Sequence, residues 1–339
     1  MRASVLRDGR MVLRDDVAEP VPESGQVLVA VKACGICGSD LHFATHGEQM
    51  VRLTREMSGM PIEGGLQVDL TQDVFMGHEY SAEVLEAGPD TDAPPAGTMV
   101  TSLPVLLSPK GFDPILTSNT TLGGFAERML LSAPLLLKIP NGLDPGHAAL
   151  TEPTAVGLHA VNKSSIEPKD TALVVGCGPI GLAIVASLRR KGVESIAAAD
   201  YSSTRRELAL TMGAQQVLDP AQASPFDSVK PSLVFEAVGT PGIINDVMRR
   251  APMGTRIVIA GVCMQPDPIL PLFGIAKEIS VQFVNAYDAG EFAESLRAIA
   301  EGEIDVAPLI TGEVGLDGVG GAFDDLAHPD TQCKILVKP

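Results

Sequence analysis

The sequence contains no tryptophan, and aromatic residues make up only 4% of its 339 residues. Basic residues are also scarce, because 25 lysines and arginines stand against 42 acidic residues and leave a formal net charge of −17. Nowhere do lysines and arginines cluster in the way that binding to a phosphate backbone requires. These shortages argue against a nucleic-acid partner and against a deep aromatic binding pocket.

Long apolar runs are missing as well. No run approaches the roughly 18 residues that a helix needs to cross a bilayer, and Met1–Asp8 lacks the apolar core of a signal peptide. There are five cysteines, an odd number that favours reduced thiols over a disulfide framework in a chain without an export signal. We therefore expect a cytoplasmic protein with no membrane partner and with at least one thiol free to bind a metal.

The length predicts two domains, and the pattern of apolar residues changes near residue 153. Before that point, residues 27–31 read as a strand, and short strands and turns continue between residues 75 and 105. Residues 43–76 are polar and irregular, and we expect them to form a loop over a functional site. This first part predicts a strand-rich, partly closed barrel.

The second part predicts a parallel sheet with helices on both faces, because apolar strand-like runs alternate with helical stretches. The chain leaves this sheet near residue 286, after which Asp288 and Glu291 resemble a capping box for another helix, and residues 334–337 read as a final strand. The predicted domains are therefore residues 1–152 with 287–339, and residues 153–286. The predicted strands of the sheet are residues 172–176, 196–200, 216–218, 233–237, 257–260 and 280–284.

A glycine-rich turn joins the first of these strands to a helix. Gly176 permits a tight turn, Gly178 lets the backbone approach a pyrophosphate, and Gly181 lets the helix pack closely on the strand. Asp200 ends the next strand, 24 residues after Gly176, where its carboxylate accepts hydrogen bonds from both ribose hydroxyls and repels a 2′-phosphate. The alternative is that the glycines only turn the chain and that Asp200 caps the following segment. The order of strand, glycines, helix and acid favours dinucleotide binding over this alternative, and the carboxylate of Asp200 favours NAD over NADP.

The role of Arg205 leaves the choice between NAD and NADP open. Its guanidinium could pair with the phosphate of NADP, cover the adenosine of NAD, or belong to a solvated helix face. The predicted cofactor-binding residues are Gly176, Gly178, Pro179, Ile180, Gly181, Asp200, Arg205 and Val238.

The first part carries the groups of a catalytic metal site. Residues 34–42 read CGICGSDLH and residues 77–79 read GHE, which together offer thiols, a hydroxyl, carboxylates and imidazoles. A structural zinc knuckle would need a second cysteine or histidine pair, and the remaining cysteines stand far apart. A thioredoxin-like redox pair would open a helix in a small βαβ domain, whereas this pair follows a strand in a β-rich region.

Taken in order, several motifs resemble zinc-dependent medium-chain alcohol dehydrogenases. They are GICGSDLH at residues 35–42, GHE at 77–79, GGFAE at 123–127, EP at 152–153 and the glycine turn. The segment EPTAVG at 152–157 is most similar to the sorbitol and butanediol dehydrogenase branch. The resemblance covers essentially the whole chain and implies an α/β protein, with a GroES-like β-rich catalytic domain and a Rossmann doubly wound nucleotide-binding domain.

The resemblance also implies the ligands of a catalytic zinc. Cys37 and His78 match two of them. Glu79 matches a residue that is a direct ligand in some relatives and a nearby exchange ligand in others. Glu152 falls where the family places either a third ligand or a catalytic carboxylate that holds the zinc-bound water. Three protein ligands and one open position are typical of catalytic zinc, so the choice between the two glutamates stays open.

Zinc of this kind lowers the pKa of a substrate alcohol. The family match implies that Ser39 takes the alcohol proton and passes it through the cofactor ribose to His42. Alone, either residue would be read as a turn or strand-end hydrogen-bonding group. Asp40 is expected to accept a hydrogen bond from the imidazole of His78, and Cys34 to be a buried thiol rather than a ligand.

The sequence departs from the family in residues 97–122, where many members carry four cysteines for a structural zinc and this chain has none. We expect one catalytic zinc per subunit and no structural zinc. The predicted function is reversible hydride transfer between NAD and a small secondary alcohol or polyol, or its ketone. Phe43, residues 46–72 and residues 103–115 are expected to shape the substrate pocket.

Two alternatives to this function stay open. One is a zinc-free quinone or enoyl reductase of the same fold, although such proteins usually lack counterparts of Cys37 and His78. The other is a non-catalytic NAD-binding scaffold.

The strand at residues 279–284 is apolar on both faces at the edge of the sheet, and such edges tend to be paired or covered. Members of the family that the chain resembles join such strands across a two-fold axis into dimers, and some dimers pair into tetramers. The resemblance therefore implies a homodimer or homotetramer.

Overall fold

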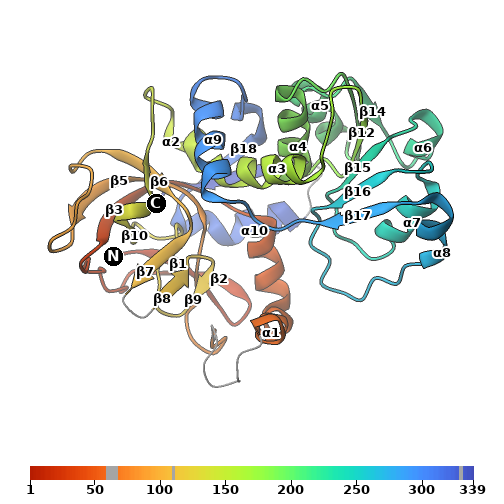
Figure 1. Ribbon diagram of the computed structural model, residues 1–339. Coiled ribbons are helices and arrows are strands. Elements are labelled where there is room, and N and C mark those ends of the chain that lie inside the picture. Colours follow the sequence, from red (N-terminus) through yellow and green to blue (C-terminus); the bar gives the residue numbers. More distant parts are fainter. Residues whose placement is uncertain (59–67, 109–110, 328–330) are drawn as a thin grey trace. The chain divides into compact units, whose positions relative to one another are not determined.

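The computed structural model describes residues 1–58, 68–108, 111–327 and 331–339. The chain divides into two compact units (Figure 1). The first comprises Met1–Glu152 and most of the chain from Ile310 onward, and the second is built mainly of Pro153–Leu309. Residues 287–309 thus lie with the second unit, beyond the predicted boundary at residue 286. None of the helices in the described part of the chain has the length and apolar character needed to cross a bilayer.

The first unit is built around a seven-stranded sheet in the order β11-β6-β5-β3-β19-β18, with β10 paired to β3. The long central strand β3 is almost entirely buried, because β10 and β5 pair along it and β19 joins at its end. The strands of this sheet are β3 (Gln26–Gly35), β5 (Glu79–Ala87), β6 (Met99–Ser102), β10 (Arg128–Ser132), β11 (Leu136–Lys138), β18 (Ile310–Val314) and β19 (Lys334–Val337). Three smaller pairs are β1 (Ala3–Arg7) with β2 (Arg10–Arg14), β4 (Phe75–Met76) with β9 (Thr117–Ser118), and β7 (Val105–Ser108) with β8 (Gly111–Pro114).

Helix α1 (Gly38–Ser58) corrects the prediction that residues 43–76 are irregular throughout. The helix is kinked at His46, whose φ of −129° and ψ of 30° are not helical. Its apolar residues Phe43 and Met50 lie seven positions apart and pack on the core of the first unit, which compensates for the weak helix signal of a polar, glycine-containing stretch. Residues 59–67 of the expected loop lie outside the described residues. The other helices of this unit are α2 (Pro145–Ala149), α10 (Val319–Ala327) and the short 3₁₀ turns Ala133–Leu135 and Leu316–Gly318.

The second unit contains a six-stranded parallel sheet in the order β14-β13-β12-β15-β16-β17. All six strands predicted from the sequence are confirmed: β12 (Thr171–Val175), β13 (Ser195–Ala199), β14 (Gln216–Leu218), β15 (Leu233–Glu236), β16 (Arg256–Ile259) and β17 (Ser280–Phe283). The order reverses between β12 and β15, which is the point where doubly wound sheets bind dinucleotides. Around the sheet lie α3 (Thr151–Lys163), α4 (Pro179–Arg190), α5 (Ser203–Met212), α6 (Pro225–Ser228), α7 (Ile243–Arg250), α8 (Pro271–Lys277), α9 (Ala289–Ala300) and the 3₁₀ turn Ala307–Leu309.

The predicted capping box at the start of α9 is also confirmed. The Asp288 side chain accepts a hydrogen bond from the backbone N–H of Glu291, and the Glu291 side chain accepts one from the backbone N–H of Asp288. Glu291 further accepts hydrogen bonds from His159 and Asn162 of α3. These contacts tie the first and last long helices of the second unit together.

Candidate functional site

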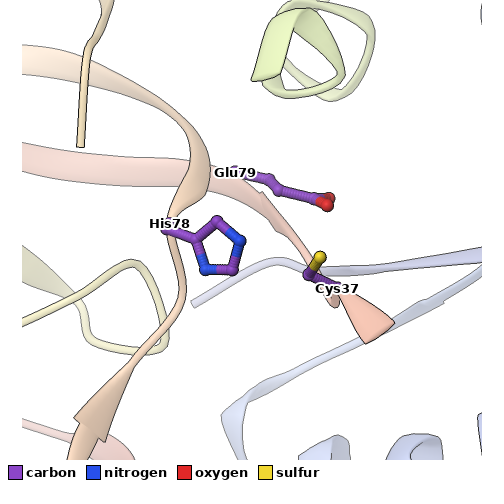
Figure 2. Close-up of side chains that lie close together, drawn as sticks. All are labelled: Cys37, His78 and Glu79. Atoms are coloured by element: carbon purple, nitrogen blue, oxygen red, sulfur yellow. The ribbon is translucent and has the colours of Figure 1, made fainter. Parts of the chain in front are cut away.

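Three side chains of types that can bind a metal meet where β3 leaves the sheet of the first unit. Cys37 follows the end of β3, His78 immediately precedes β5, and Glu79 is the first residue of β5. Because β3 and β5 are antiparallel and Gly35 pairs with Glu79, the two short motifs are brought together. One donor atom from each side chain lies within 4.8 Å of the other two, and Figure 2 shows the three side chains around a common space. Thiolate, imidazole and carboxylate are ligand types of catalytic zinc sites.

Glycines make room for this cluster. A Cβ atom at Gly35 would lie 2.1 Å from Oε2 of Glu79, so any larger residue would displace the carboxylate. A Cβ atom at Gly124 would lie 2.5 Å from Sγ of Cys34. The Cys34 thiol is buried, and this burial raises its pKa well above the ordinary value. Cys34 therefore has the surroundings of a packed thiol and lies outside the three-residue cluster.

Asp40 lies beside His78 but does not make the expected hydrogen bond. Its Oδ1 is 3.6 Å from Nδ1 of His78, longer than a hydrogen bond, while its Oδ2 accepts one from the backbone N–H of Cys37 at 2.9 Å. Burial acts to lower the pKa of His78, but the Asp40 carboxylate and Cys37 outweigh it and raise the pKa well above the ordinary value. Because a metal binds only the neutral imidazole, metal binding at this cluster would release a proton.

Glu79 has a partner that the sequence reading missed. The Nζ atom of Lys334 lies 2.7 Å from each carboxylate oxygen of Glu79 and donates to the backbone carbonyl of Ile36 at 2.9 Å. The side chains of Lys334 and Glu79 are 2% and 0% exposed. A lysine at the start of a strand whose other residues are all apolar was the signal that this position is special. The carboxylate of the metal cluster is thus held by a buried ammonium group.

Glu152 belongs to the same unit but not to the cluster. It lies in the first turn of α3 and is 9% exposed. The pKa of Tyr80 in β5 is raised mainly by burial and also by Cys34 and by the negative charge of Glu152. Of the two candidate glutamates, Glu79 therefore lies within the three-residue cluster, whereas Glu152 lies outside it.

The two predicted proton-transfer residues lie on the first turns of α1. Ser39 is half-buried and lines a cavity of about 190 Å³ together with Asp40 and His78. His42 is exposed one turn further along and does not line that cavity. Partial desolvation and the neighbouring His46 lower the pKa of His42, so the imidazole is neutral at pH 7 and able to accept a proton.

The predicted dinucleotide turn has the expected form in the second unit. Gly176 has a φ of +95°, a left-handed conformation that favours glycine. Gly178 caps α4, which begins with Pro179, and a Cβ atom at Gly181 would lie 1.9 Å from the carbonyl oxygen of Gly176. The N–H groups of the first turn of α4, including that of Ile180, thus stand at the switch point of the sheet, where a helix terminus attracts anions.

The remaining predicted cofactor residues surround this turn. The Asp200 carboxylate accepts hydrogen bonds from the backbone N–H groups of Cys177 and Ser202, each at 2.8 Å. A Cβ atom at Gly178 would lie 3.9 Å from a guanidinium nitrogen of Arg205, so this side chain reaches the turn from α5. Val238 follows β15 and comes close enough that a Cβ atom at Gly176 would lie 2.7 Å from its Cγ2.

Comparison with known proteins gives consistent similarities over both units. Residues 23–141 match the model of the alcohol dehydrogenase GroES-like domain, and residues 179–301 match that of zinc-binding dehydrogenases. The (R,R)-butanediol dehydrogenase of Bacillus subtilis (strain 168) is 29% identical over an alignment of 356 positions, which covers 100% of both chains. The sorbitol dehydrogenase of the same organism is 25% identical, covering 100% of this chain and 97% of that protein. The crystal structure of the B. subtilis 2R,3R-butanediol dehydrogenase matches with a TM-score of 0.83 at 28% identity, covering 100% of this chain and 99% of that one.

Proposed function

Because this chain belongs to the zinc-dependent medium-chain dehydrogenase family, we propose that it catalyses reversible hydride transfer between NAD and a small secondary alcohol or polyol, or its ketone. The observation that carries this proposal is the convergence of Cys37, His78 and Glu79 within 4.8 Å. The alternative of a zinc-free quinone or enoyl reductase is not favoured, because such an enzyme has no use for this combination of thiol, imidazole and carboxylate.

The three side chains fit one catalytic zinc. Sulfur, nitrogen and oxygen donors in one cluster satisfy the count of three protein ligands and leave a position open for a substrate oxygen. When bound there, zinc supplies the Lewis-acid chemistry that lowers the pKa of an alcohol. The cluster favours Glu79 over Glu152 as the third protein ligand. No structural zinc is proposed, because residues 97–122 contain no cysteine and their described part includes strands β6, β7, β8 and β9.

Ser39 and His42 are proposed to carry the proton of the reaction. Ser39 lies on the cavity beside His78, where its hydroxyl can accept a proton from a bound alcohol as it passes its own onward. His42 is exposed and its pKa is lowered, so it can take this proton and release it to water. The path from one residue to the other is proposed to include the ribose of the cofactor.

NAD is proposed as the cofactor because of Asp200. Asp200 follows the end of β13, where the ribose of a dinucleotide would lie. Its carboxylate accepts a hydrogen bond from the backbone N–H of Cys177 in the glycine turn. A second negative charge on a 2′-phosphate would be repelled there. Arg205 is the residue that could reverse this preference, since it reaches the same turn. The ratio of kcat/KM for NAD to that for NADP measures the balance directly, and a value below one would overturn the choice of NAD.

The edge strand β17 supports a proposed homo-oligomer. All four of its residues are exposed, with Phe283 at 65%, and α8 next to it exposes Leu272 and Ile275 at 61% and 75%. An unprotected sheet edge that exposes apolar side chains such as Val281 and Phe283 favours pairing with a second copy, as a dimer or within a tetramer. Light scattering at micromolar concentration tests this, with Phe283→Asp expected to give monomers.

A cytoplasmic location is also proposed. The described cysteines form no disulfide, which supports this location.

Metal analysis of the wild type and of Cys37→Ser tests the central proposal. After dialysis against trace zinc, about one zinc per subunit is expected in the wild type and almost none in the variant. Alcohol oxidation should be lost in the variant while NAD binding persists, because the dinucleotide turn lies in the other unit. Absence of zinc from the wild type would favour a zinc-free reductase, and unchanged turnover in Cys37→Ser would overturn the proposed role of the cluster.

A further inference from the structure

Most of the described residues that line the cavity beside His78 are apolar. One end is formed by Ser39, Asp40 and His78, which belong to the proposed reaction site. The other described residues that line its volume of about 190 Å³ are Phe43, Met50, Val51, Thr54, Val68, Pro114, Leu116 and Thr117. Helix α1 provides half of these eight, and the segment from the end of β8 to β9 provides three more. The helix that replaces the expected loop therefore builds one side of the cavity.

The chemistry of this wall excludes strongly polar substrate groups. Among the described residues that line the cavity, Asp40 and His78 are the only charged or titratable ones, and both lie at the reaction end. Within the part of the lining that the structure describes, there is no lysine or arginine for a phosphate, and no amide or second carboxylate for a row of hydroxyls. Away from the reaction end, the described lining offers two polar side chains, the hydroxyls of Thr54 and Thr117.

We propose that this cavity binds the alkyl arm of a short-chain aliphatic secondary alcohol or its ketone, and that it discriminates against polyols and sugar phosphates. The inference rests on the proposed function and narrows its substrate class. The volume of about 190 Å³ sets the length of the arm. Because an apolar cavity of about 150 Å³ accommodates benzene, this one accepts an arm of up to about six carbons.

The discrimination follows from burial and from unmet hydrogen bonds. Each methylene group that enters the cavity should raise kcat/KM about fourfold. Each hydroxyl that is buried there without a partner should lower it at least about fivefold. A hexitol carries more hydroxyls than Thr54 and Thr117 can satisfy. Its kcat/KM should therefore be lowered both by unpaired hydroxyls and by the lack of methylene groups to bury.

A substrate panel with the zinc-loaded enzyme and NAD tests this inference. Between 2-propanol and 2-hexanol, kcat/KM should rise by about 60-fold, through the three added methylenes. Xylitol and sorbitol should fall at least about 25-fold below 2-hexanol, as expected for two unpaired hydroxyls. A kcat/KM for either polyol that equals or exceeds that for 2-hexanol would overturn the inference while leaving the dehydrogenase function intact. Failure to oxidise any alcohol would instead overturn the proposed function.

Filling the cavity provides the second arm of the test. Met50→Trp should lower the ratio of kcat/KM for 2-hexanol to that for 2-propanol at least tenfold, because the larger ring occupies the space for the longer arm. Met57→Trp is the matched control, since Met57 lies on the same helix, does not line the cavity and is 79% exposed. Val51→Phe fills the cavity from the adjacent position, and zinc content verifies that each variant keeps its metal site. An unchanged ratio in both cavity variants, or an equal fall in the control, would contradict the assignment.

Discussion

Replacing Lys334 with methionine would remove the ammonium group that holds Glu79 and leave the apolar stem of the side chain in place. The Glu79 side chain is 0% exposed, and with no metal bound its carboxylate would lose two contacts of 2.7 Å. The carbonyl of Ile36 would lose its donor as well. Removing one partner of a buried ion pair typically destabilises a protein by about 3–5 kcal/mol, because the other charge stays buried without compensation.

Zinc should reduce this loss. A metal ion bound to Cys37, His78 and Glu79 would place a positive charge against the same carboxylate, and it would do so whether or not Lys334 is present. The free energy of unfolding should therefore fall by about 3–5 kcal/mol in the metal-free variant and by clearly less in the zinc-loaded variant. By reciprocity, the folded variant should bind zinc more tightly than the folded wild type does.

Hydrogen exchange of backbone amides in β3 and β19 measures this effect, because both strands belong to the first unit and report on its unfolding alone. Lys338→Met is the matched control: Lys338 pairs with Glu313 at the surface, with the two side chains 45% and 50% exposed. Such a pair contributes at most about 1 kcal/mol. A metal-free Lys334→Met that loses no more than this control, or that loses the same amount with and without zinc, would refute the reasoning.

Three further predictions concern single side chains. His42→Gln should lower kcat near pH 7 by on the order of 100-fold, with partial recovery at higher pH where hydroxide can take the proton; an unchanged pH–rate profile would remove His42 from the proton path. Asp200→Asn should raise KM for NAD by about 10-fold or more and narrow the preference over NADP, and equal effects on both cofactors would contradict the repulsion argument. Burial opposes ionisation of Asp170, yet its hydrogen bonds, including those from Arg256 and Ser232, lower its pKa. These bonds therefore stabilise the folded protein fully above the unfolded pKa of about 3.9, and this stabilisation is lost as the pH falls through the lower folded pKa. Asp170→Asn should lower the urea midpoint at pH 7 and change it little at pH 2. A decrease of equal size at both pH values would contradict this account.

The sheet of the second unit could be predicted strand by strand because its signals are local. Each apolar run is bounded by turns and lies between helical stretches, so neither its type nor its position depends on distant partners. The capping box of Asp288 and Glu291 is local in the same way. Helix α1 was missed because its sequence is polar, contains Gly47 and breaks at His46. Its helical conformation is stabilised by packing of Phe43 and its neighbours on strands that are distant in the sequence.

The cluster of Cys37, His78 and Glu79 could likewise be predicted only in its local part. Cys37, His78 and Glu79 stand in two short motifs that could be recognised in the sequence. Lys334 is 255 residues from Glu79, and its strand carries no motif at all. Only the pairing of β19 with the end of β3 brings its ammonium group under the carboxylate. A pairing of this kind depends on the order of strands in the sheet, which periodicity within one strand does not reveal.

The position of Lys334 also bears on why the chain returns to the first unit after the nucleotide-binding sheet. The last strand, β19, adds to the end of β3 where Gly35 pairs with both Glu79 and Leu336. The absence of a side chain at Gly35 leaves the space that the Glu79 carboxylate fills, and Lys334 neutralises that carboxylate from the other side. Three segments that are far apart in sequence thus determine the charge and position of the Glu79 carboxylate, a proposed ligand. The last of these segments is β19, so truncation before residue 334 would remove both the ammonium group and the pairing of β19 with β3. It should therefore destabilise the first unit of the metal-free protein by more than Lys334→Met does, and an equal loss in hydrogen-exchange protection of β3 would contradict this argument.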